Sequence, residues 1–205
     1  MKNLAIFISG GGSNFRAIQA SILAGRIEAQ VALVVTDKPQ CPGAVYAREQ
    51  GIEVYIYPTH DRQPTDLLQA LEDRECRLVV LAGYLKMVPS EVVRAYQRRM
   101  LNIHPALLPA FGGQGYYGRR VHEAVLQSGQ TQSGATVHFV DEQYDHGPIV
   151  AQATVPVLPG DTPESLAARV LEQEHILYPQ VVAALCRGAL SWDHDGRPVI
   201  DSAIA

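Results

Sequence analysis

Residues 3–14 read NLAIFISGGGSN, a short apolar run that ends in a serine and three glycines. The run is typical of a buried β-strand, and Phe15, Ile18 and Ile22 follow at helical spacing. We therefore expect a strand over residues 3–8 and a helix over residues 13–23. The loop between them places flexible glycines and unpaired N–H groups at a helix N-terminus, where a phosphate can bind. The alternative is a tight strand-to-helix turn capped by Ser13.

Two common nucleotide-binding loops do not fit this stretch. Phe15 stands where a dinucleotide fingerprint has its third glycine, and no Gly-Lys-Ser/Thr sequence follows as it does in a P-loop. The loop alone therefore favours a cradle for a single phosphate group over a dinucleotide site.

Similar apolar runs alternate with helix-like segments through the first half of the chain, which predicts βαβ units around a mostly parallel, doubly wound α/β sheet. The second half is richer in β-strands, and Thr162 and Pro163 are suited to cap and begin a helix there. Strands are expected over residues 3–8, 31–35, 53–57, 78–82, 100–103, 135–140 and 149–157. Helices are expected over residues 13–23, 42–50 and 65–71 and, as one helix or two, over residues 162–186. From Gly188 onward we expect a short hairpin or a loosely packed terminus.

Composition narrows the class of protein. The chain has 205 residues, 47% of them apolar and 19% charged, which favours one domain with a substantial core. Its formal charge of −4, without long charged runs, offers no basic surface for nucleic acid and no polybasic membrane anchor. No apolar run is long enough for a signal peptide or a membrane span, so we expect a cytoplasmic protein.

The cysteines and most of the histidines suggest no metal site. Cys41, Cys76 and Cys186 lie far apart without a C-x-x-C motif, so we interpret them as small buried or incidental residues. Six histidines show neither H-x-x-x-H spacing nor a cysteine partner, and for them we expect surface or core positions. These are His60, His122, His138, His146, His175 and His194.

Asn102 and His104 follow one another at the end of the strand expected over residues 100–103, where open α/β sheets bind their ligands. In an extended segment the two side chains point to the same side. His104 alone is as typical of a buried structural histidine as of a catalytic one. Asp145, in a later loop with Gly147 and Pro148, could bond His104 and raise its pKa. The glycine-rich stretch 112–118 predicts either a substrate lid or a plain surface loop.

Four segments in this order resemble the phosphoribosylglycinamide formyltransferases, nearly from end to end. They read ISGGGSN (residues 8–14), LAGYLKMV (81–88), LNIHPALLP (101–109) and GATVHFVD (134–141), with Asp145 following. The third is typical of formyltransferases in general, whereas the first, the fourth and Gln173-Glu174-His175 indicate the purine enzyme. The resemblance implies a Rossmann-like formyltransferase fold and formyl transfer from 10-formyltetrahydrofolate to glycinamide ribonucleotide (GAR), without a metal.

The resemblance also assigns roles to single residues. It implies that the GAR phosphate is held by Gly11, Gly12, Ser13 and Asn14, with Glu174 closing on the same substrate. The folate would contact Arg62, Lys86, Met87, Val88, Asn102, Asp141 and Asp145. Catalysis would fall to Asn102, His104 and Asp145. Departures from the family pattern are Gly11 where some members have Asn, Lys86 for Arg, His146 for Gly, and the stretch 112–118 for a shorter Pro-Gly loop.

The resemblance predicts a single domain over residues 1–205, with a phosphate-binding half (1–100), a catalytic and folate-binding half (101–187) and a tail (188–205). It leaves a homodimer open. In the predicted mechanism, Asn102 and protonated His104 donate hydrogen bonds to the tetrahedral oxyanion that forms when the amine attacks the formyl carbon. Asp145 would hold the imidazole and favour its charged form.

Three other functions compete with this one. A formyltetrahydrofolate hydrolase resembles a longer chain with an N-terminal regulatory domain, and a methionyl-tRNA formyltransferase has a further C-terminal domain and a basic tRNA surface. At 205 residues and a charge of −4 neither extra part is expected. A catalytically silent nucleotide- or folate-binding module would keep the glycine loop but would not need Asn102, His104 and Asp145 together.

Overall fold

The computed structural model describes residues 1–58 and 63–201, which fold as two compact units, Met1–Leu101 and Asn102–Ala205. The expectation of one continuous domain stays a prediction. Among the described residues, no helix is both long and apolar enough to span a membrane.

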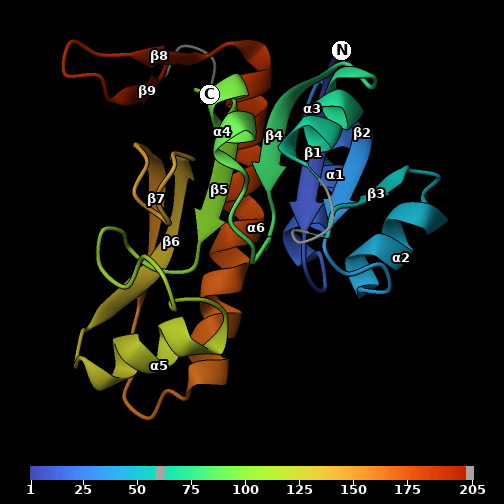
Figure 1. Cartoon of the computed structure of the whole chain (residues 1–205). Coiled ribbons are helices and arrows are strands. Elements are labelled where there is room, and N and C mark those ends of the chain that lie inside the picture. Colours follow the sequence, from blue (N-terminus) through green and yellow to red (C-terminus); the bar gives the residue numbers. More distant parts are fainter. Residues whose placement is uncertain (59–62, 202–205) are drawn as a thin grey trace. The chain divides into compact units, whose positions relative to one another are not determined.

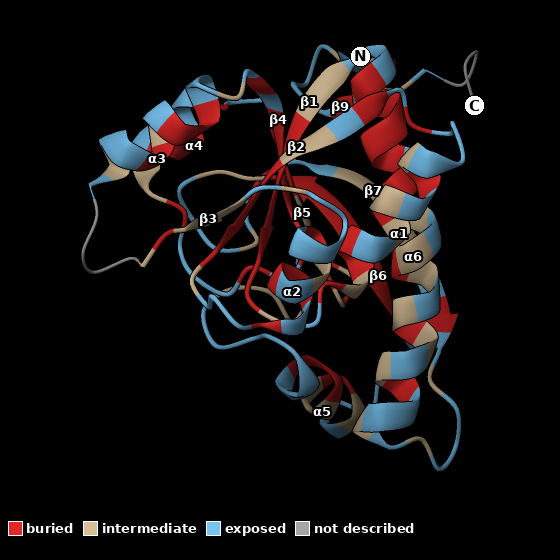
Figure 2. Cartoon of the chain, turned by 90° about the vertical axis from the view of Figure 1, so that its right-hand side faces the viewer, coloured by how far each residue is buried: buried red, intermediate tan, exposed pale blue. Residues whose placement is uncertain are grey.

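The first unit is built on parallel strands. Strand β1 (Lys2–Ile8) pairs in parallel with β2 (Ala29–Thr36) on one side and with β4 (Cys76–Leu81) on the other, and β2 pairs in parallel with β3 (Val54–Ile56). The side chains of β1 from Leu4 to Ile8 are completely buried. Its helices are α1 (Ser13–Leu23), α2 (Pro42–Glu49), α3 (Pro64–Glu72) and α4 (Ser90–Ala95). They carry buried residues beside exposed ones, as expected for helices that cover a sheet (Figure 2).

The strand order shows the doubly wound topology. The strands are hydrogen-bonded in the order β3-β2-β1-β4-β5-β6-β7, and β5 (Met100–His104) begins in the first unit and ends in the second. The chain runs outward from β1 to β3 and then returns to β4 on the other side of β1. This reversal between β1 and β4 is the switch point at which such sheets bind ligands. The predicted mostly parallel α/β sheet is confirmed.

The second unit combines an antiparallel strand pair with a long helix (Figure 1). Strands β6 (Gln132–Phe139) and β7 (Ile149–Pro156) are antiparallel, and α6 (Pro163–Arg187) packs on both of them and on α5 (Arg119–Gln127). The segment expected as one helix or two is a single helix. As predicted, Thr162 is its N-cap and accepts a hydrogen bond from the Ser165 N–H at 3.2 Å. The tail is a hairpin of β8 (Leu190–Trp192) and β9 (Pro198–Ile200).

The structure corrects the sequence-based expectations at three helices. Ser13 does not cap α1, because the N-cap is Gly12 and no side chain caps this helix. Helices α4 and α5 were not expected: α4 has six residues, and α5 buries only Val121, His122 and Val125. With six residues, α4 shows too few turns for a reliable apolar period. The three cysteines are buried and free, as predicted.

Candidate active site

The loop after β1 is tied to the ends of two neighbouring strands by the buried Ser9. Its hydroxyl donates to Asp37 Oδ1 at 2.6 Å and accepts from the Leu85 N–H at 3.0 Å, while its own N–H donates to the Gly83 carbonyl at 3.0 Å. Asp37 follows β2, and Gly83 and Leu85 follow β4. Ser9 therefore joins the carboxyl ends of β1, β2 and β4 at the switch point.

Beyond Ser9 the loop leads directly into α1. Gly12 has a φ of 70°, a left-handed conformation that favours glycine, and a side chain on Gly10 or Gly11 would meet nothing within 4 Å. Ser13 begins the helix and Asn14 is buried in its first turn. The loop is thus open to a ligand at the N-terminus of a helix.

The segment predicted to bind the folate leaves large apolar side chains uncovered. Leu85 is 47% exposed and Met87 43%, and Lys86 between them is exposed, whereas Val88 is buried. Exposed apolar side chains after a central strand fit a flat heteroaromatic ligand. Arg62, predicted to reach the folate, lies outside the described residues.

Asn102 and His104 lie on β5, and both reach the Asp145 carboxylate. Asn102 Nδ2 is 3.3 Å from Asp145 Oδ1, and His104 Nδ1 is 3.4 Å from Asp145 Oδ2. His104 is 3% exposed, and Asp145 has a φ of 53°, a left-handed conformation that aspartate tolerates better than most residues. The three residues that the resemblance named therefore form one cluster.

A fourth side chain, His138 on β6, belongs to this cluster. Its Nδ1 donates to the Phe139 carbonyl at 2.8 Å, so in the neutral ring Nε2 accepts from Asn102 Nδ2 at 3.1 Å. His138 Nε2 is also 3.6 Å from Asp145 Oδ1. From its sequence context, His138 is expected only at a surface or core position. The available signal was the alternation of Thr136 and His138, two polar residues on the same face of the strand.

The chain is similar to known formyltransferases in sequence and in structure. The formyl transferase family matches residues 2–182 of the chain. The chloroplastic phosphoribosylglycinamide formyltransferase of Vigna unguiculata is 52% identical over 98% of this chain and 66% of its own length, and that of Arabidopsis thaliana is 51% identical over 98% and 71%. The crystal structure of glycinamide ribonucleotide transformylase 1 from Symbiobacterium toebii has a TM-score of 0.88 at 37% identity, covering 98% of this chain and 94% of that one.

The chain belongs to the phosphoribosylglycinamide formyltransferase family. The resemblance inferred from the sequence is therefore confirmed. The prediction that the protein is a transferase of purine biosynthesis is confirmed as well. The family uses a formyl donor derived from folate.

Two opposing effects act on the pKa of His104. Burial lowers the pKa of His104 below its ordinary value, and the opposing effects of Asp145 and of the Phe111 carbonyl do not outweigh it. Asp145 therefore raises the pKa of His104 as predicted, but burial, which the sequence did not reveal, has the larger effect. The Asp145 carboxyl is also buried, which favours its neutral form, yet His138, His104 and the Gly113 N–H together lower its pKa.

The glycine-rich stretch begins inside the cluster. His104 Nε2 donates to the Phe111 carbonyl at 2.7 Å, and the Gly113 N–H donates to Asp145 Oδ2 at 3.0 Å. A neutral imidazole has one N–H, so it cannot donate both to Phe111 and to Asp145, whereas an imidazolium can. Tyr116 and Tyr117, further along the loop, are exposed. The start of this loop thus contacts both members of the His104–Asp145 pair.

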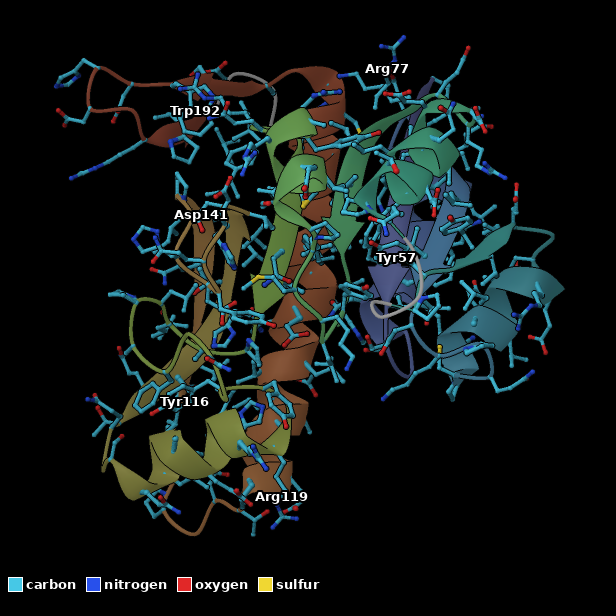
Figure 3. All side chains as sticks on the ribbon, in the orientation of Figure 1. Tyr57, Arg77, Tyr116, Arg119, Asp141 and Trp192 are labelled. Atoms are coloured by element: carbon cyan, nitrogen blue, oxygen red, sulfur yellow. The ribbon has the colours of Figure 1, made fainter. Side chains whose placement is uncertain are left out.

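The remaining predicted residues occupy varied positions. Asp141 lies two residues after β6 and accepts from His146 Nδ1 at 2.7 Å. Figure 3 shows its side chain there, with Tyr116 on the loop before α5. Glu174 is buried on α6 and His122 on α5. Within residues 1–58 and 63–201, no three His, Cys, Asp or Glu side chains are grouped to hold a metal. A metal-free reaction stays a prediction.

Proposed function

We propose that the protein transfers the formyl group of 10-formyltetrahydrofolate to the amine of GAR, giving formyl-GAR and tetrahydrofolate. The observation that carries this proposal is the convergence of Asn102, His104 and Asp145 in a member of the phosphoribosylglycinamide formyltransferase family. An amide, an imidazole and a carboxylate are suited to acyl transfer to an amine.

The reaction forms one C–N bond and breaks another. The GAR amine attacks the formyl carbon, the carbonyl oxygen becomes an oxyanion, and the bond to the folate nitrogen breaks while a proton moves from the amine to that nitrogen. Asn102 and protonated His104 donate to the oxyanion, and Asp145 stabilises the His104 imidazolium. Because His104 Nε2 is bonded to the Phe111 carbonyl in this structure, the formyl oxygen replaces that carbonyl as the acceptor.

Substrate recognition is assigned from the resemblance and supported by the local geometry. Gly11, Gly12, Ser13 and Asn14 hold the GAR phosphate at the N-terminus of α1, with Glu174 closing on the ribonucleotide. Lys86, Met87 and Val88 contact the folate, as do Asn102, Asp141, Asp145 and Arg62. The uncovered side chains of Leu85 and Met87 support this assignment.

The wider setting of the enzyme also belongs to the proposal. A homodimer, a chemistry without metal and the absence of nucleic-acid or membrane partners stay predictions. So does the cytoplasmic location, since the Vigna and Arabidopsis relatives are named as chloroplastic proteins.

One assay tests the proposed function. Purified protein is incubated with 10-formyltetrahydrofolate, with and without GAR, and tetrahydrofolate and formyl-GAR are both quantified. Tetrahydrofolate release that depends on GAR and equals formyl-GAR supports transfer. Release at the same rate without GAR would show a hydrolase, and no release would show a binding module.

Replacing Gly12 by valine is expected to weaken GAR binding about a hundredfold or more, because charge-assisted hydrogen bonds to the phosphate would be lost. A β-branched residue is disfavoured at a φ of 70°, and its Cβ would lie 3.0 Å from the Gly43 Cα. The measurement is GAR affinity by calorimetry, with circular dichroism to confirm the fold. A folded variant with unchanged affinity would contradict phosphate binding at this loop.

A further inference from the structure

Gly43, the second residue of α2, is packed against the loop that carries the phosphate site. Its N–H donates to the Gly10 carbonyl at 3.1 Å. The contact lies within the first unit and joins the start of α2 to the loop that leads into α1. Neither the motifs nor the proposed mechanism assigns a role to this residue.

The approach of the two backbones is too close for a side chain. A Cβ on Gly43 would lie 2.7 Å from Ile8 Cδ1, 3.1 Å from the Gly10 oxygen and 3.2 Å from the Gly12 Cα. In the other direction, a Cβ on Gly12 would lie 3.0 Å from the Gly43 Cα. The two glycines thus face each other directly. At about 3 Å from backbone atoms, a methyl group cannot fit unless the loop moves.

The requirement for glycine at position 43 is steric. Gly43 has an ordinary helical conformation, in which alanine is the better helix former, so glycine there weakens α2. The close approach of the loop explains why position 43 is nevertheless a glycine. The two sides of the loop also differ, since Gly12 is in contact with Gly43 whereas Gly10 and Gly11 have open space where a side chain would be. The loop is supported on one side and open to a ligand on the other.

We propose that Gly43 is a positioning residue for the ribonucleotide substrate. This proposal rests on the proposed function, in which the loop holds the GAR phosphate. By allowing α2 to contact the loop, Gly43 fixes the peptide groups of Gly10 and Gly12 in the orientation that directs the N–H groups at the start of α1 toward the phosphate. It acts through the loop and touches neither substrate.

The direct test is Gly43→Ala, assayed for formyl transfer with each substrate varied in turn. The added methyl group displaces the loop by a few tenths of an ångström, which weakens hydrogen bonds to the phosphate but leaves the His104–Asp145 pair intact. We expect KM for GAR to rise about tenfold, with kcat and KM for 10-formyltetrahydrofolate changed less than twofold.

Two further variants separate this effect from lost stability. Ala47→Gly, in the same helix, weakens α2 by removing a methyl group without adding bulk near the loop, and KM for GAR should not change. Ile8→Val combined with Gly43→Ala removes the Cδ1 atom that the new methyl group would meet at 2.7 Å. This double variant should regain thermal stability and still show the raised KM for GAR, because the contacts with Gly10 and Gly12 persist.

The outcomes are distinct. A folded Gly43→Ala protein with KM for GAR within twofold of the wild type overturns the role of Gly43, and so does an equal rise in both KM values. A normal KM for GAR in the double variant Ile8→Val, Gly43→Ala overturns this role as well, because the raised KM would then arise from the clash with Ile8 in the core. Failure of the wild-type protein to formylate GAR overturns the proposed function itself, and the role of Gly43 with it.

Discussion

Replacing Asn102 by alanine is expected to lower kcat for formyl transfer about a hundredfold to a thousandfold, the usual effect of losing one oxyanion donor. The Asn102 amide lies within 3.3 Å of both Asp145 Oδ1 and His138 Nε2, so it is held in place before substrate arrives. Donation to the developing oxyanion is stronger than donation to the neutral formyl oxygen. The loss should therefore appear in kcat, with the KM for GAR little changed. Steady-state kinetics with both substrates measures it.

A second amide in the same unit is the control that separates catalysis from packing. Gln152 is exposed, and its Nε2 donates to the Leu108 carbonyl at 3.0 Å and to Thr136 Oγ1 at 2.8 Å. Gln152→Ala should lower stability by about 1 kcal/mol for its lost hydrogen bonds and leave kcat within threefold. If Asn102→Ala were no slower than Gln152→Ala per folded molecule, Asn102 would not stabilise the transition state.

Most of the regular elements could be predicted because each shows an apolar pattern that is long enough to recognise, either a continuous apolar run in a strand or helical spacing over more than one turn. The apolar run from Leu4 to Ile8, followed by the helix over Ser13–Leu23, located the first βα unit to within a residue. The six-residue α4 shows no comparable period. Its formation depends on packing against α3, which local sequence does not encode.

The site could be predicted only in part. The alternation of side chains along a strand places Asn102 and His104 on one side, but their meeting with Asp145 depends on a contact across more than 40 residues. Only the family resemblance joined them beforehand. The contacts of the Phe111 carbonyl and the Gly113 N–H were not predicted. Every residue type carries the same backbone groups, so the sequence does not indicate which of them the loop brings to the site.

The pKa of His104 shows why the sign of such an effect requires the structure. A neighbouring carboxylate raises the pKa of a histidine, and this much can be inferred from Asp145. Burial lowers it, and the degree of burial depends on every element around the ring. In the folded protein His104 is 3% exposed, and burial has the larger effect.

Asp145→Asn is expected to lower kcat about a hundredfold while the protein remains folded. Asp145 stabilises the imidazolium of His104 against the cost of burial, so without the carboxylate the pKa of His104 should fall further below its ordinary value. The unfolded chain then binds a proton at His104 that the folded chain does not, over a range that begins near pH 6.5 and extends downward. Within that range stability decreases as the pH falls, and the range should be wider in Asp145→Asn.

NMR titration of His104 in the wild type and in Asp145→Asn measures the coupling directly. The limb of the kcat pH profile on which His104 loses its proton should move to lower pH in the variant, in step with the titration of the ring. Asp161→Asn is the control, because it removes a carboxylate that accepts from Arg169 at 2.7 and 2.9 Å and should cost stability without moving either curve. A carboxylate with only a structural role would behave in the same way. Superimposable His104 titrations in the wild type and in Asp145→Asn would mean that the two groups are not coupled, and the mechanism would be wrong.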